Sequence, residues 1–158
     1  MTQDPTTGAI SVSEDAHTEL GSAADAWEKY LKVNKGQASP VIAAQMVQAY
    51  YFLADFGGAA QAQQIVAADQ PSSGSYGQLA YYLYASLSIS EGDQAAVTAQ
   101  AEAPKSQRSE IKKQLGQIRE QAVKLKKQQA KAQKNAPSTT TPGDNPLQSP
   151  FGGGSTTP

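Results

Sequence analysis

Residues 41–104 contain one helical hairpin pattern written about twice, and this repetition constrains the fold more than any other feature. Three pairs of identical residues lie 34 positions apart and a fourth pair lies 33 apart: Tyr50 and Tyr84, Leu53 and Leu87, Gly58 and Gly92, then Pro71 and Pro104. Self-similarity at this period is typical of stacked helix pairs, which bury an apolar face only against their neighbours. We therefore predict an all-α chain, a short α-solenoid of antiparallel helix pairs.

Composition supports helix and narrows the possible chemistry. Ala and Gln are abundant and no strand-like alternation runs for long, which favours helix. The chain has no Cys, so disulfides and thiolate chemistry are excluded. No apolar run approaches the roughly 18 residues that a membrane span needs. We expect a soluble chain, cytoplasmic by default, or tethered if it is part of a longer anchored protein.

Capping and stop signals divide the chain into six helices. Ser13 precedes two acidic residues and Ser39 precedes a proline, and both are typical helix starts. Gly57-Gly58 and Glu91-Gly92-Asp93 are expected to make the reversals between paired helices. The predicted helices span residues 13–33, 39–55, 59–70, 75–90, a short stretch to about 101, and 105–134.

The two ends of the chain differ from its middle. Residues 1–12 hold Pro5, Gly8 and three threonines, and we expect them to be irregular. Residues 135–158 are Pro, Ser, Thr and Gly with little to bury, so we expect a disordered tail. Residues 13–125 should form the packed array, and the helix at 105–134 should project beyond it.

The run Ala49–Ala59, continued to Pro71, resembles a tetratricopeptide repeat. Tyr50, Asp55-Phe56, Ala59 and Pro71 occupy that family's offsets for the first-helix Tyr, the turn, the small residue and the closing Pro. Ala54 stands where that family usually has a glycine in the turn. Ala43, Met46 and Val47 stand where the family's first helix usually carries the Trp-x-x-Leu-Gly motif. The resemblance covers residues 20–104 as two and a half divergent units, because residues 23–34 look like a second helix without its first.

The resemblance implies a non-enzymatic scaffold that binds a peptide or helix of another protein in a groove formed by the first helices. Tyr and Gln suit such a surface, because Tyr adds contact area and a polar tip. Tyr50 and Tyr84 are expected in the core, whereas Tyr51 and Tyr82 could serve either the groove or the core. The groove positions carried over from the family are Val41, Ala44, Gln48, Tyr51 and Phe52, then Gln78, Tyr82 and Ala85 at the 34-residue spacing.

A basic helix provides an alternative function. Residues 1–104 carry three basic and eleven acidic side chains, a net charge of −8, whereas residues 105–134 carry ten basic and two acidic ones, a net charge of +8. The alternative is an electrostatic tether to nucleic acid or an anionic membrane surface. It is less favoured than a solvated capping helix, because the segment has no aromatic residue and only a narrow apolar stripe. Its candidate contacts are Lys112, Lys113, Arg119, Lys124, Lys126, Lys127 and Lys131.

Other signals are weak or missing. Ile111, Leu115, Ile118, Ala122 and Leu125 form a heptad-like seam, so we expect a monomer with at most weak self-association through Ile111, Leu115 and Ile118. His17 is the only histidine and reads as a solvated residue near a helix start. No phosphate-binding, dinucleotide or nucleophile motif is present. We therefore predict no enzymatic activity, no metal site and no cofactor.

Overall fold

The computed structural model describes residues 2–3, 10–34 and 38–135, and it confirms the all-α class. Two-residue strands β1 (Thr2–Gln3) and β2 (Ile10–Ser11) pair antiparallel within the segment predicted to be irregular. The expected disordered tail lies outside the described residues. The helices are α1 (Glu14–Val33), α2 (Pro40–Phe52), α3 (Phe56–Asp69), α4 (Ser73–Ala85), α5 (Ile89–Glu102) and α6 (Arg108–Asn135).

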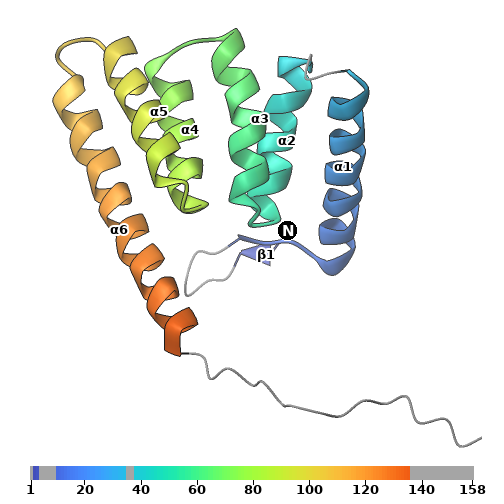
Figure 1. The fold of residues 1–158 in the computed structure, drawn as a ribbon. Helices are drawn as coiled ribbons and strands as arrows, with labels where there is room; N and C mark the ends of the chain where they lie inside the picture. Colours follow the sequence, from blue (N-terminus) through green and yellow to red (C-terminus); the bar gives the residue numbers. More distant parts are fainter. Residues whose placement is uncertain (1, 4–9, 35–37, 136–158) are drawn as a thin grey trace, which may run out of the picture.

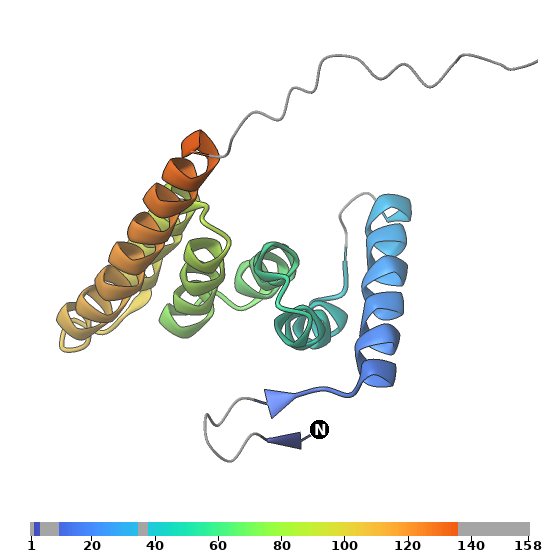
Figure 2. The ribbon, with the colours of Figure 1, turned by 90° about the horizontal axis from the view of Figure 1, so that it is seen from below.

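The helices pack in chain order, each against the next. Figure 1 shows them side by side, and Figure 2 shows α1 and α6 at opposite ends with α2–α5 between them. We call α2–α5 the helical array. Helix α4 contacts α3, α5 and α6, whereas α1 packs mainly on α2. The array is therefore held more firmly at its α6 end than at its α1 end.

Three helix starts are fixed by side-chain caps. Ser13 accepts a hydrogen bond from the backbone N–H of Ala16, as its predicted capping role requires. Asp55 accepts from the N–H of Gly58 at 2.9 Å and begins α3 three residues earlier than expected. Ser72 and Ser75 form a reciprocal capping box at the start of α4.

Both reversals differ from the expectation that glycines would make them. Helix α2 ends at Phe52 rather than near Asp55, because Ala54 adopts a left-handed conformation with φ of 55°. Helix α4 ends at Ala85 rather than at residue 90, because Leu87 does the same with φ of 63°. Gly58 and Gly92 lie inside α3 and α5 instead. The reversals thus use non-glycine residues in a conformation that L-residues seldom adopt.

The repeat has two registers, which differ by one residue. Helices α4 and α5 begin and end 33 residues after α2 and α3, and the two left-handed residues are also 33 apart. The aromatic-to-glycine contacts are 34 apart: Tyr50 packs on Gly58 and Tyr84 packs on Gly92. The Tyr and Gly identities spaced by 34 in the sequence therefore mark the ring contacts, not the spacing of the helices.

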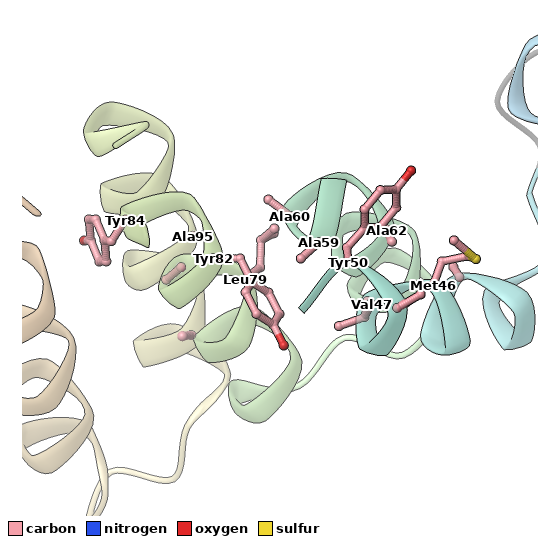
Figure 3. Packing of buried hydrophobic residues seen from close by; sticks show 14 of the residues in the cluster. Met46, Val47, Tyr50, Ala59, Ala60, Ala62, Leu79, Tyr82, Tyr84 and Ala95 are labelled. Atoms are coloured by element: carbon pink, nitrogen blue, oxygen red, sulfur yellow. The ribbon is translucent and has the colours of Figure 1, made fainter. Parts of the chain in front are cut away.

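The core is built from large aromatic rings among many alanines (Figure 3). Trp27, Tyr50 and Tyr84 are 4%, 5% and 2% exposed, so the predicted place of the two tyrosines in the core is confirmed. Trp27 also stacks on Tyr30 with ring centroids 5.4 Å apart. Alanines such as Ala59 are fully covered and let neighbouring helices approach closely. The core therefore contains few large side chains, and a few aromatic rings supply much of its apolar area.

Candidate functional site

A groove of about 610 Å³ runs across three consecutive helices in the described part of the chain. One wall comes from α3 and the other from α5. Helix α4 forms the floor together with the turn between α4 and α5. We call it the α3–α5 groove. It is lined by Gly57, Ala60, Gln61, Gln64, Tyr76, Leu79, Leu83, Ser86, Ser88, Glu91, Gln94, Ala95 and Thr98.

The groove has an apolar floor and a polar rim. Leu79 of α4 is buried and supplies the floor, and the buried Ala60 and Ala95 lie on its α3 and α5 sides (Figure 3). Gln61 and Gln64 stand exposed on the α3 wall and Gln94 stands exposed on the α5 wall. A primary amide both donates and accepts hydrogen bonds, as a peptide group does. The groove can therefore hold an apolar side chain while its rim bonds to a peptide backbone.

Charge in the groove is sparse. Glu91, in the first turn of α5, is the only ionisable carboxyl group among the lining residues, and no cation lines the groove. A neutral or cationic ligand is therefore electrostatically preferred over an anionic one.

A buried polar contact fixes the groove wall to its floor. Gln63 is 3% exposed, and its Nε2 donates to the Ser75 carbonyl oxygen at 3.0 Å, which ties α3 to the first turn of α4. Ser75 is also the reciprocal partner in the α4 capping box. A satisfied buried amide of this kind specifies one relative position of two helices, because leaving it unpaired would be costly.

The predicted first-helix residues of α2 do share one face. Val41, Ala44, Gln48 and Tyr51 are all exposed, and Phe52 is half-buried beside them. Val41 is 71% and Tyr51 47% exposed, so this face offers real apolar area. The Tyr51 ring packs edge-on against Phe52 and Phe56 at centroid distances of 6.0 and 6.4 Å. None of these predicted residues lines the α3–α5 groove.

The predicted residues of α4 are less accessible. Gln78 is exposed and Ala85 half-buried, but Tyr82 is only 5% exposed and packs edge-on against Tyr81. Burial, and then the neighbouring Tyr81 and Tyr51, raise the pKa of Tyr82 above its usual 10.0. The structure thus brings Tyr51 and Tyr82 into one neighbourhood but covers the second ring. Because the helices repeat at 33 residues, Tyr81 rather than Tyr82 is the counterpart of Gln48.

One cation of the predicted basic helix is paired with the array. Arg119 of α6 donates to both carboxylate oxygens of Asp93 on α5, at 2.7 and 3.0 Å. The Tyr84 hydroxyl of α4 donates to the same carboxylate at 2.9 Å. The hydrogen bond from Arg119 holds the pKa of Asp93 below its usual value, assisted by Tyr84 and opposed by slight burial. Burial and the bond to Asp93 raise the pKa of Tyr84 far above 10.0, so its hydroxyl stays a donor.

Other cations of this segment donate to backbone carbonyls, line a hollow or are exposed. Arg108 donates to the carbonyls of Ala101 and Ala103 at the end of α5. Lys126 donates to the carbonyl of Leu87 in the α4–α5 turn at 3.1 Å. Lys112 lines a hollow of about 250 Å³ between α5 and α6, together with Arg119. Lys113, Lys124, Lys127 and Lys131 are exposed, and no described acidic side chain pairs with them.

The apolar seam of α6 is largely used within the chain. Leu115 is 7% and Ala122 4% exposed, while Ile111 and Ile118 are half-buried against the core. Leu125 is 53% exposed. Of the three residues predicted for self-association, Leu115 is thus covered by the chain itself.

Nowhere in residues 2–3, 10–34 and 38–135 do three or more His, Asp or Glu gather as a possible metal site. No helix in this part of the chain has both the length and the hydropathy to cross a bilayer. His17 is exposed, as predicted.

Comparison with models of known protein families, with curated proteins and with solved structures finds no match to this chain.

The groove was missed by sequence reasoning, because its walls belong to the second helices of the two pairs. The signal that could have found it is the exposed amides on these helices. Gln61 and Gln64 are one turn apart on α3, and Gln94 is 33 residues after Gln61. Residues at equal positions of stacked helices face the same side, so these side chains were candidates for one surface.

Proposed function

We propose that this chain is a short, tetratricopeptide-like α-solenoid that acts as a non-catalytic protein-interaction module. The proposed ligand is an extended peptide segment of another protein, held in the α3–α5 groove. The observation that carries this proposal is the groove itself, with an apolar floor at Leu79 and amides on both walls. An extended peptide needs backbone hydrogen-bond partners along its length, and the glutamines of the two walls supply both donors and acceptors.

The face of α2 is the competing site for the same function. Val41 and Tyr51 are exposed on this face, which favours an apolar partner helix. It is not continued by an open groove on α4, because Tyr82 is covered. We therefore place the peptide in the α3–α5 groove and use Tyr51 to separate the two sites.

The test begins with a displayed library of random peptides, selected on the intact chain, and a labelled peptide from that selection. Fluorescence anisotropy then compares the wild type with the groove variant Gln61→Ala/Gln64→Ala/Gln94→Ala. Three lost hydrogen bonds, at roughly 0.5–1.5 kcal/mol each, should weaken binding by about 10- to 1000-fold.

The matched control is Gln114→Ala/Gln117→Ala/Gln121→Ala, which removes three exposed amides from α6. It should bind as the wild type does. If Tyr51→Ala abolishes binding while the groove variant binds normally, the site is the face of α2. If the library yields no peptide that the groove variant loses, the proposal is wrong.

A further inference from the structure

Seven of the nine cations of α6 form two sets, which differ in the direction of their side chains. Arg108, Arg119 and Lys126 are each bonded to the array, two of them to backbone carbonyls and one to Asp93. These three side chains lie on the side of α6 that carries the buried Leu115 and Ala122. They are therefore explained by the docking of the helix.

The second set lies on the far side of the helix. At about 100° per residue, Lys113, Lys124, Lys127 and Lys131 fall within about 60° of one another and about 120–180° from Leu115. All four are exposed. We call them the lysine row; it extends about 27 Å along the helix axis at about 1.5 Å per residue. Docking does not explain it, because the row points away from the array.

From this row we infer a surface that lies on an anionic lipid membrane and holds its phosphate and carboxylate headgroups. A single straight row of ammonium groups can touch a plane along its whole length. A helix in the major groove of duplex nucleic acid instead has phosphates on both sides and needs cations on both flanks. The lysine row has only one flank, and it has no aromatic residue on which bases could stack.

The charge distribution of the whole chain favours the same orientation. Helix α1 carries five acidic and two basic side chains and lies at the opposite end of the array from α6 (Figures 1 and 2). A negative surface would therefore attract the α6 end and repel the α1 end. The α3–α5 groove contains none of the row, so this inference does not rest on the proposed peptide binding.

Vesicle flotation with the full chain tests the surface. The probes are phosphatidylcholine vesicles with and without phosphatidylserine, each at low and at physiological salt. The row variant is Lys124→Gln/Lys127→Gln/Lys131→Gln. Its matched control is Lys29→Gln/Lys32→Gln/Lys105→Gln, which removes the same charge from exposed lysines outside the row. Circular dichroism checks that both variants keep the helix content of the wild type.

We expect the wild type to bind only the vesicles that contain phosphatidylserine, and more weakly as salt rises. The row variant should bind about 100-fold more weakly, and the control within about threefold of the wild type. Glu120 lies in the row one turn before Lys124, so Glu120→Gln should strengthen binding several-fold. Equal binding to both vesicles, or equal losses in both triple variants, would overturn the inference. Tighter binding to duplex DNA than to vesicles at equal phosphate would reassign the row to nucleic acid.

Discussion

The ring of Tyr84 occupies the space that a side chain on Gly92 would need. An ideal Cβ atom at Gly92 would lie 2.6 Å from two ring carbons of Tyr84. The same relation joins Tyr50 and Gly58, where the distance would be 2.4 Å. Each pair brings the end of one helix against the start of the next, so a missing side chain and a large ring together set how closely the two helices pack.

Gly92→Ala should therefore destabilise the chain. Tyr84 is 2% exposed and bonded to Asp93, so its ring has little room to move. We expect the free energy of unfolding to fall by about 1–3 kcal/mol, as for other overpacked cores. Gly116→Ala in α6 is the control, because nothing lies within 4 Å of its added Cβ. There alanine should stabilise the helix by about 0.5–1 kcal/mol. Urea unfolding measures the change in the free energy of unfolding for each variant. If both variants shift it in the same direction, the packing argument is wrong.

Ala54→Gly should stabilise the chain. Ala54 is exposed and has φ of 55°, which costs an L-residue about 1 kcal/mol and costs glycine almost nothing. The comparison is Ala44→Gly, an exposed site inside α2, where glycine should destabilise by about 0.5–1 kcal/mol. Thermal unfolding of the two variants should shift in opposite directions. A fall in melting temperature for Ala54→Gly would show that the turn gains nothing from glycine.

Two leucines of α6 should differ sharply when shortened. Leu115 is buried in the core, so Leu115→Ala should cost about 2–5 kcal/mol of unfolding free energy. Leu125 is 53% exposed, and Leu125→Ala should change stability by no more than about 0.5 kcal/mol. Denaturant unfolding of the pair tests whether α6 is docked as described. Similar losses at both sites would mean that the docked part of the helix extends further.

Acid should loosen α6 through Asp93. Its pKa is lowered in the folded chain, so its contribution is complete above the usual value of 3.8 and is lost as the pH falls below it. Asp93→Asn has no carboxyl group at this position and so removes this dependence. The free energies of unfolding of the variant and the wild type should therefore approach each other as the pH drops through that range. Hydrogen exchange of α6 amides reports the loosening.

The starts of α1 and α2 and the burial of two large core side chains could be predicted from sequence. Ser13 and Pro40 act locally, through capping and a fixed φ, so no tertiary information was needed. The buried places of Tyr50 and Tyr84 were expected from the resemblance to a helical repeat.

The turns and the site could not be predicted in the same way. Ala54 and Leu87 adopt the left-handed conformation although neither is a glycine, the residue that usually indicates it in a sequence. The reversals were therefore assigned to the neighbouring glycines. Gly58 and Gly92 are small because a ring from the preceding helix lies against them, which is a tertiary fact. The α3–α5 groove likewise depends on the relative placement of helices that are distant in sequence.

The unequal attachment of the two terminal helices sets an order of opening. Helix α1 packs mainly on α2, whereas α6 contacts both α4 and α5 and adds the bonds of Arg119 and Lys126. Local unfolding begins where the fewest buried contacts must break, so α1 should unravel first and its amides should exchange fastest. The α3–α5 groove contains no residue of α1. A molecule whose first helix has already frayed would thus still present an intact groove to its ligand.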